Sequence, residues 1–518
     1  MAQAQETRPP LQGGQLVLAT FAVALATFMN VLDTSIANVA IPTISGDLGV
    51  SVNEGTWVIT VFAATTAVSI PLTGWLTQRI GQVKLFVGAI LLFVIASWLC
   101  GIAPTLPILL AARVLQGAVA GPMIPLSQAI LLDSYPKQKA SSALALWAMT
   151  ATVGPIAGPA LGGWITDNYS WSWIFYINIP VGLLAASVTW IIYRKRETPT
   201  HRLPIDTVGL GLLIAWVASL QIMLDKGKDL DWFSSTFIVG LAITAVVAFA
   251  FFVVWELTAE NPVVDLRLFG QRNFLGGTVA IAVAYGVFFG SFVLLPQWMQ
   301  EYLGYRSIDA GLVTAPLGIF AVILSPIMGR ILPKSDPRVL ATIAFLLFAY
   351  VFYLRSKYVL EIDTWHLVWP TLLQGVPIAM FFVPLTAILL SGQPPNKIPA
   401  AAGLSNFVRV FCGAIGTSIS TTEWNNRTVL HHVRLTEQAN VFNPAFVQQI
   451  DSLKALFHLN TESARGLFDF TVNAQAAMMG INDMFYISAI IFILIIPLIW
   501  ITKPVKGGAG ASAAAAAH

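Results

Sequence analysis

Charged residues are scarce in this sequence, and their scarcity excludes most soluble classes of protein. Only 10% of the 518 residues are Asp, Glu, Lys or Arg, whereas a water-soluble surface needs roughly a quarter. The net charge of +3 is too small and too dispersed to indicate nucleic-acid binding. The only cysteines, Cys100 and Cys412, lie in apolar runs, which argues against a disulfide framework or a cysteine-based metal site. Hydrophobic residues make up 56% of the chain and the mean hydropathy is +0.75, which together predict an integral membrane protein.

Fourteen apolar segments, separated by short polar or Gly/Pro-containing stretches, approach the length that crosses a bilayer. A spanning helix needs about 20 apolar residues. We therefore predict an all-α integral membrane protein with 14 transmembrane helices, at residues 15–42, 55–76, 83–103, 107–132, 140–165, 171–193, 207–224, 234–255, 274–298, 308–331, 338–354, 365–391, 398–421 and 483–502.

The distribution of Lys and Arg between the predicted loops sets the orientation. Seventeen of these residues fall on the side that carries both termini and nine on the other, four of them in one long loop. Because positive charge accumulates in cytoplasmic loops, both termini are predicted to be cytoplasmic, in a multi-pass protein of the bacterial inner membrane. The first segment is too long for a cleavable signal peptide, so we expect the N-terminus to stay attached.

The second half of the chain repeats the first. Leu115-Gln116-Gly117 recurs 258 residues later as Leu373-Gln374-Gly375, and the Pro-Leu pair that follows recurs at an offset of 259. Two parallel six-helix repeats around a midplane cavity are the architecture of a rocking secondary transporter. The predicted domains are an N-terminal six-helix bundle at 1–195, two inserted transmembrane helices with linkers at 196–272, a C-terminal six-helix bundle at 273–502 with a periplasmic loop at 422–482, and a Gly/Ala tail at 503–518.

Away from the ends of the predicted spans, only three charged residues lie within them: Asp33, Arg113 and Arg409. A charge at the centre of a membrane helix costs roughly 2.5 to 3.5 kcal/mol on insertion scales, so each should face the bundle interior. Counted from Pro42 and Pro107 at the outer ends of their helices, Asp33 and Arg113 differ in depth by only ~5 Å, and we expect them to pair. The pair is either a static fastening of two helices or a proton-coupling site, in which Asp33 alternates between protonated and ionised forms.

Two glycine-rich patterns are candidates for moving parts. In the fifth segment, glycines four residues apart predict close helix contact and two prolines predict a bend, although ordinary membrane-helix packing explains the glycines equally well. The second pattern is a basic cytoplasmic turn that is either a positive-inside anchor or a gate between the halves. These gating or antiporter-motif candidates are Gly154, Pro155, Gly158, Pro159, Gly162 and Gly163 in the fifth segment, and Gly74, Arg79, Gly81 and Lys84 in the turn.

A polyspecific cavity would be apolar with a few polar groups. Its candidate lining residues are Met29, Asn30, Trp57, Gln116, Met123, Gln128, Phe288, Phe289, Gln297, Asn406 and Arg409, for each of which packing in the core or against lipid is the alternative. No phosphate-binding loop, catalytic Ser/His/Asp set or metal-spaced His/Cys cluster is present in the sequence. The adjacent His431 and His432 are interpreted as a solvated loop feature. We therefore predict neither an enzyme nor a bound cofactor or metal.

Several of these stretches occur together in one family. The chain resembles the major facilitator superfamily in its fourteen-helix drug:proton antiporter branch, and within it the EmrB-type multidrug exporters of Gram-negative inner membranes. The resemblance is carried by residues 31–42 around Asp33, the 74–84 turn, residues 110–117 around Arg113, the 154–163 glycine pattern and residues 171–180. One position departs from the family pattern, because Gln78 stands where an acidic residue is usual.

The resemblance implies proton-driven export of amphiphilic or hydrophobic small-molecule drugs, with the proton gradient as the energy source. It also implies a tripartite pump with a periplasmic adaptor (EmrA-like) and an outer-membrane channel (TolC-like). The alternatives are an exporter of a defined metabolite or fatty acid, and a non-transporting membrane assembly factor. The long outer loop, 422–482, carries apolar residues at near-helical spacing; we expect amphipathic helices that either dock the adaptor or lie on the membrane surface.

Overall fold

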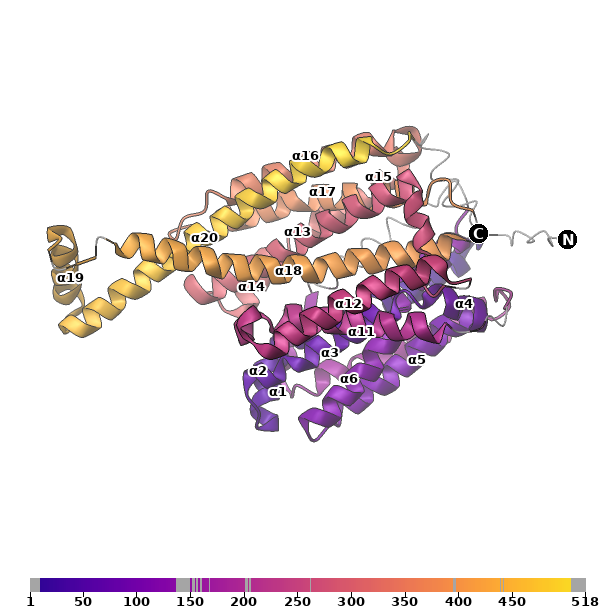
Figure 1. Cartoon of the computed structure of the whole chain (residues 1–518), viewed down its shortest axis with the longest axis horizontal. Coiled ribbons are helices and arrows are strands. Elements are labelled where there is room, and N and C mark those ends of the chain that lie inside the picture. The colour runs from indigo at the N-terminus through magenta and orange to yellow at the C-terminus, as the bar shows by residue number, and fades with distance from the viewer. Residues whose placement is uncertain are drawn as a thin grey trace.

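The computed structural model describes residues 10–136, 150, 154, 157–158, 161–166, 168–200, 204, 206–260, 262–394, 397–437, 439–440 and 442–504, which form helices and their connections (Figure 1). The α-helices are α1 (Gly13–Leu48), α2 (Val52–Gly55), α3 (Trp57–Ser69), α4 (Thr73–Ile80), α5 (Gln82–Gly101), α6 (Leu106–Ala120), α7 (Met123–Ser134), α9 (Trp173–Tyr176), α10 (Asn178–Tyr193), α11 (Thr207–Lys226), α12 (Thr236–Thr258), α13 (Arg272–Tyr302), α14 (Ser307–Thr314), α15 (Leu317–Ile331), α16 (Pro337–Arg355), α17 (Thr364–Leu390), α18 (Ile398–Thr436), α19 (Pro444–Phe457) and α20 (Thr461–Trp500).

Most of the predicted spans correspond to long apolar helices. In the described part of the chain, ten helices are long and apolar enough to cross a membrane, and α3 with α4 makes an eleventh if this pair, bent by 62°, is one span. The predicted segment 308–331 is divided between α14 and α15, and 398–421 lies within the longer α18. The segment 140–165 lies mostly outside the described residues. The protein is therefore a multi-pass membrane protein, and the count of fourteen stays a prediction.

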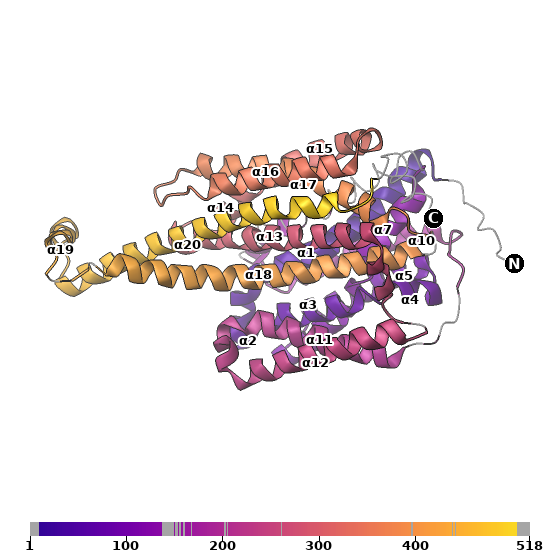
Figure 2. The ribbon, with the colours of Figure 1, turned by 45° about the horizontal axis from the view of Figure 1, so that its top comes forward.

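Two helical bundles lie side by side along one axis, with the inserted helices packed between them on one side (Figures 1 and 2). The N-terminal bundle comprises α1 to α10, the inserted pair α11 and α12, and the C-terminal bundle α13 to α20. Helix α11 packs against α3 of the first bundle and α18 of the second. The first and last described residues lie at the same end of the molecule (Figure 1). The inserted pair therefore lies along the boundary between the two bundles, which we call the seam.

The outer ends of α18 and α20 extend far beyond the predicted spans, which the sequence pattern did not predict. Between them lies α19, so the segment 422–482 is a helical hairpin with one short crossing helix rather than a loop (Figure 1). The Trp424 indole donates to the carbonyl of Ala477 at 2.9 Å, and a Cβ on Gly480 would lie 3.2 Å from the backbone nitrogen of Thr428. Close packing therefore continues α18 and α20 outward as a pair. We call residues 422–482 the outer hairpin.

The interpretation of the two histidines as a solvated loop feature is wrong. Both lie in α18, and each contacts a different acidic residue of α20: His431 Nε2 is 2.9 Å from Asp483 and His432 Nε2 is 3.0 Å from Asp469. Adjacent residues of a helix point about 100° apart, which directs them to separate partners. No group of three potential metal ligands occurs in the part of the chain that the structure describes.

Candidate functional site

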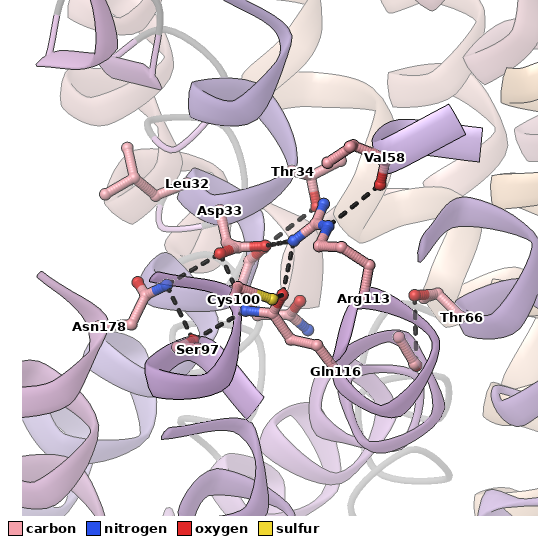
Figure 3. A network of polar contacts seen from close by, with 12 residues as sticks. Leu32, Asp33, Thr34, Val58, Thr66, Ser97, Cys100, Arg113, Gln116 and Asn178 are labelled. Atoms are coloured by element: carbon pink, nitrogen blue, oxygen red, sulfur yellow. Dashed lines mark hydrogen bonds and ion pairs between the residues drawn. The ribbon is translucent and has the colours of Figure 1, made fainter. Parts of the chain in front are cut away.

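Asp33 and Arg113 form an ion pair in the interior of the N-terminal bundle (Figure 3). Arg113 Nη1 lies 2.7 Å from Asp33 Oδ2, and both side chains are completely buried. Arg113 Nε donates to the carbonyl of Val58 at 3.1 Å. The pairing expected from the estimated depths is therefore present, and it joins α1, α3 and α6.

Polar side chains complete the coordination of the Asp33 carboxylate. Its Oδ1 accepts hydrogen bonds from Gln116 Nε2 at 3.1 Å and from Asn178 Nδ2 at 2.8 Å. Ser97 Oγ accepts from the same two amide groups, at 2.8 and 3.2 Å (Figure 3). Three donors from three side chains therefore converge on its two oxygens. We call Asp33, Ser97, Arg113, Gln116 and Asn178 the polar node.

Two of these residues were missed by sequence reasoning and one was assigned elsewhere. Gln116 was a candidate for the substrate cavity, but it is fully buried and binds Asp33. It lies one helical turn after Arg113, so both face α1. Asn178 begins α10. It follows a stretch rich in aromatic residues, and this stretch was the only sequence signal near it. Ser97 is an uncharged residue in an apolar helix, and nothing in the sequence marked it.

Aromatic rings surround the guanidinium group and keep water away from it. Arg113 Cζ lies 4.0 Å from the centroid of the Phe62 ring and 5.5 Å from that of Phe175. In such a low-dielectric setting the attraction between the two charges is strong, but burial also removes the hydration of each charge, which costs free energy. Removing one partner of a buried ion pair costs about 3 to 5 kcal/mol, because the other is left uncompensated. The ionised pair is therefore stable only while both charges are present.

Glycines of the fifth predicted span hold the neighbouring surface of α1. A Cβ on Gly158 would lie 1.8 Å from Ser35 Oγ and 3.1 Å from the backbone nitrogen of Ile36. A Cβ on Gly162 would lie 3.0 Å from the carbonyl oxygen of Ile36, and one on Gly154 would lie 2.7 Å from Val31. These close approaches require glycine, so the groove interpretation fits. Pro155 and Pro159 lie outside the described residues, and the carbonyl of Gly163 accepts a hydrogen bond from Thr166 Oγ1 at 3.0 Å.

The C-terminal bundle has a corresponding glycine contact. Gly416 lies 258 residues after Gly158, the offset of the sequence repeat. A Cβ on Gly416 would lie 2.2 Å from the carbonyl oxygen of Gly286, and a Cβ on Gly290 would lie 2.9 Å from the carbonyl oxygen of Gly416. Helices α13 and α18 are thus in backbone contact, as α1 is with the fifth span. The glycine packing is repeated in both bundles.

The polar node, by contrast, is not repeated. At the same offset of 258, Arg113 corresponds to Thr371 and Ser97 corresponds to Arg355. Arg355 Nη2 donates to Thr371 Oγ1 at 3.0 Å, and its guanidinium lies 5.8 Å from the rings of both Phe352 and Phe485. No carboxylate pairs with Arg355 among the described ion pairs. Among the described residues, an ion pair with both side chains completely buried occurs only in the N-terminal bundle.

The turn at residues 74–84 joins the two bundles and holds an unexpected acidic partner. A Cβ on Gly74 would lie 3.6 Å from Ala400 Cα, so α4 touches the start of α18.

The Glu197 carboxylate lies against the same turn. Gly81 has φ 97°, which favours glycine, and a Cβ there would lie 2.5 Å from the Glu197 carboxyl group. That carboxylate accepts from the backbone N–H groups of Val83 and Lys84 at 3.0 and 2.9 Å. Arg79 lies over the Trp75 ring at 5.2 Å. Glu197 therefore supplies a carboxylate to the turn, although Gln78 does not.

The remaining cavity candidates do not converge on one place. Met29 and Met123 belong to the core of the N-terminal bundle. The Asn30 amide donates to the carbonyl of Ala120 at 3.0 Å. The centroid of the Trp57 ring lies 5.2 Å from Lys226 Nζ. The Gln297 amide donates to the Glu301 carboxylate at an exposed position. The structure does not bring these five together, and a role for them in binding substrate stays a prediction.

Five other candidates lie near the seam or the interior of the C-terminal bundle. The Asn406 amide donates to Gln128 Oε1 at 3.4 Å, a contact between α18 and α7 of opposite bundles. Phe288 and Phe289 lie in a cluster of aromatic rings. Arg409 is buried, and its Cζ lies 5.0 Å from the centroid of the Tyr285 ring. Their role in binding substrate stays a prediction.

The comparisons with known proteins agree with this architecture. The model of the Major Facilitator Superfamily matches residues 23–417. The chain is 51% identical to the Multidrug export protein EmrB of Escherichia coli (strain K12), over 98% of this chain and 99% of the relative. It is 48% identical to the Fatty acid resistance protein FarB of Neisseria gonorrhoeae, over 97% of this chain and 99% of that relative.

Among solved structures, the proton:xylose symporter XylE aligns with a TM-score of 0.59 and 14% identity, over 97% of this chain and 99% of that chain. This likeness concerns the fold alone. The family model and the relatives cover most of the chain, including the polar node and the glycine contacts. The chain therefore belongs to the Major Facilitator Superfamily, in its EmrB-type branch.

Proposed function

We propose that this protein is a proton-coupled antiporter that exports amphiphilic or hydrophobic drugs across the inner membrane, with both termini in the cytoplasm. Full-length relatives at 51 and 47% identity are named multidrug export proteins, which supports drug export. The single observation that supports proton coupling is the buried Asp33 carboxylate with its three donors. It is a titratable group in the membrane interior, where ionisable side chains are retained for function.

The node suggests how a proton would be coupled to movement. In its ionised form Asp33 attracts Arg113, Gln116 and Asn178, and so fastens α1 to α6 and α10. Protonation from the outer side removes the negative charge and weakens all three hydrogen bonds, because charge-assisted bonds are about twice as strong as neutral ones. The helices are then free to rearrange toward the inward-open state. Loss of the proton to the cytoplasm restores the fastening.

The test uses everted membrane vesicles that acidify their interior, with a fluorescent amphiphilic drug as the substrate. Asp33→Asn keeps the shape of the side chain but cannot titrate, so proton-driven accumulation should fall to the background level while drug binding persists. Asp47→Asn, which changes an exposed carboxyl group near the end of the same helix, is the matched control. Undiminished accumulation by Asp33→Asn would overturn the coupling role.

Fatty acid export is a second candidate function, because one full-length relative at 48% identity is named a fatty acid resistance protein. The same vesicles distinguish the two. Drug accumulation that long-chain fatty acids do not inhibit, together with drug resistance in cells, favours the drug exporter. Fatty acid resistance without drug resistance favours the alternative.

We further propose that the outer hairpin docks a periplasmic adaptor of a tripartite pump that ends in an outer-membrane channel. Phe446 packs on Phe468 of α20 with ring centroids 5.1 Å apart, whereas Phe442 is 91% exposed and Leu456 is 73% exposed. An open groove follows the exposed side of α19, lined by Phe442, Pro444, Val447, Gln448, Asp451, Ser452 and Ala455. Apolar side chains exposed well beyond the bilayer-spanning part of α18 and α20 are typical of a protein-binding surface.

A further inference from the structure

Two acidic side chains meet where the chain enters and leaves the inserted pair. Asp206 directly precedes α11, and Glu256 lies near the end of α12. A Cβ on Gly209 would lie 2.4 Å from Asp206 Oδ2 and 2.6 Å from Glu256 Oε1. The two carboxylate oxygens can therefore be no further apart than the sum of these distances. Gly209 allows both to approach the same point.

The two groups differ in their hydrogen bonds. Asp206 accepts from the backbone N–H of Gly209 at 2.9 Å and from the Trp255 indole at 3.0 and 2.9 Å, so both of its oxygens have donors. Glu256 is completely buried. Its Oε2 accepts from the backbone N–H of Val264 at 3.0 Å, but its Oε1 has no hydrogen-bond partner. An ionised carboxylate in this position would be a buried charge with one unsatisfied oxygen, which is costly.

The charged groups around Glu256 also favour a bound proton. Asp206 Oδ2 and Glu256 Oε1 lie close to the same point beside Gly209, and a neighbouring negative charge disfavours ionisation of a carboxyl group. On the adjacent linker, Arg267 donates to the carbonyls of Leu257 and Ala259 at 3.2 and 3.4 Å. Asp265 of the same linker is paired with Lys397 at 2.8 Å. These linker charges are already engaged elsewhere.

We propose that Asp206 and Glu256 together bind one proton at neutral pH, carried on Glu256 Oε1. This site is separate from the polar node and lies at the end of the inserted pair that adjoins α4, because the Trp75 indole of α4 donates to the carbonyl of Pro204 at 3.3 Å. Glu256 also holds Val264, and the next residue is Asp265, which binds Lys397 at the start of α18. Loss of the proton places two negative charges together and strains the linker between the inserted pair and the C-terminal bundle. The site therefore senses pH on the side of the two termini.

Infrared difference spectroscopy of the purified, full-length protein in nanodiscs tests this proposal. The carbonyl stretch of a protonated carboxyl group should be present at neutral pH, be lost in Glu256→Gln and persist in Asp33→Asn. Glu260→Gln changes an exposed carboxyl group on the same linker and is the matched control. A neutral-pH carboxyl signal that is absent from the wild type, or unchanged in Glu256→Gln, would overturn the proposal.

A second variant tests the role of the neighbouring charge. Asp206→Asn keeps the size of the side chain but removes its negative charge, so the carboxyl signal of Glu256 should disappear at a lower pH than in the wild type. A titration midpoint that does not move would show that the two groups do not share a proton site. This measurement stands by itself if Glu256→Gln fails to fold, and neither spectrum depends on drug transport.

Discussion

Asn178 and Arg113 hold the carboxylate of Asp33 through different oxygens, the amide on Oδ1 at 2.8 Å and the guanidinium on Oδ2 at 2.7 Å. Asn178 stands at the start of α10, so the carboxylate ties this helix as well as α6 to α1. A neutral amide can keep its hydrogen bond to Ser97 when Asp33 is protonated. Arg113 keeps its hydrogen bonds to the Val58 carbonyl and the Gln116 amide oxygen, but its charge then loses its negative partner. The two contacts should therefore respond differently to substitution.

Replacing Asn178 by Leu should move the pH profile of transport rather than abolish transport. The substitution removes one donor to the ionised form of Asp33, which makes the charged form less favourable, so the profile should shift toward higher pH. Drug accumulation in vesicles, measured across a pH series, gives the profile. Asn168→Ala changes an exposed amide and should leave it unmoved. An unshifted profile for Asn178→Leu would show that this amide has only a packing role.

Replacing Arg113 by Ala should have a larger effect in the same direction. The nearest positive charge is lost, and an opposite charge within about 4 to 6 Å strongly favours ionisation of a carboxyl group. The pH optimum of transport should shift upward, or transport should be lost at all pH values. Arg113→Lys keeps the charge but cannot reproduce the fork that binds both Asp33 and Val58, so it should retain part of the activity. An unchanged profile in Arg113→Ala would contradict the coupling.

The sequence predicted the charged part of the node because charges in membrane spans are expensive and therefore informative. Asp33 and Arg113 were found in this way, and their depths were estimated from the rise of a helix. Ser97 and Asn178 could not be found, because neutral polar residues are common in spans and their partners depend on how each helix is rotated. For the same reason the sequence did not show that Met29 and Met123 belong to the core of the N-terminal bundle, because one sequence does not reveal which face of a helix points to the core.

Long-range packing limited the prediction of the fold as well. The glycines of the fifth span predicted a close contact, but not that α1 was the partner. The sequence pattern ended the span in α18 at residue 421 and began the span in α20 at residue 483, because polar residues become frequent between these positions. Their outward continuation depends on contacts between the two helices, such as Trp424 with Ala477. Glu197 was likewise beyond reach, because it follows its partner Val83 by 114 residues.

Valine in place of Gly158 should separate α1 from the fifth span. Its Cβ would meet Ser35 Oγ at 1.8 Å and the backbone nitrogen of Ile36 at 3.1 Å, and the backbone cannot move aside as a side chain can. Overpacking of this kind typically costs about 1 to 3 kcal/mol. Thermal unfolding in detergent should show a lower midpoint, with reduced transport. Gly88→Val is the control, because no atom lies within 4 Å of a Cβ at Gly88; equal midpoints for the two variants would refute the groove.

Replacing Glu197 by Ala should destabilise the turn at residues 74–84. Its carboxylate binds two backbone N–H groups in the first turn of α5, where a negative charge also interacts favourably with the helix dipole. Loss of a helix cap costs about 0.5 to 2 kcal/mol. The expected results are a lower unfolding midpoint and slower transport, whereas Glu361→Ala, at an exposed position, should change neither. Wild-type behaviour of Glu197→Ala would mean that the carboxylate does not support the turn.

The outer hairpin should be required for resistance in cells but not for transport in vesicles. Deletion of residues 442–469 removes α19 and should abolish resistance, but it also truncates α20 and removes the contact of His432 with Asp469. A sharper change is the double substitution Phe442→Ser and Leu456→Ser, because both side chains are largely exposed and their loss leaves the packing of Phe446 on Phe468 intact.

Drug accumulation in vesicles should be unchanged in this double variant, since the polar node and the seam are untouched, while co-purification with the adaptor and resistance of intact cells should both decrease. Phe233→Ser is the matched control, because Phe233 is 67% exposed in the connection between α11 and α12 but lies outside the hairpin. If the adaptor still co-purifies with the double variant and with the deletion, the hairpin does not dock it. A hairpin that instead lies on the membrane surface would lose binding to lipid vesicles in the double variant and keep the adaptor.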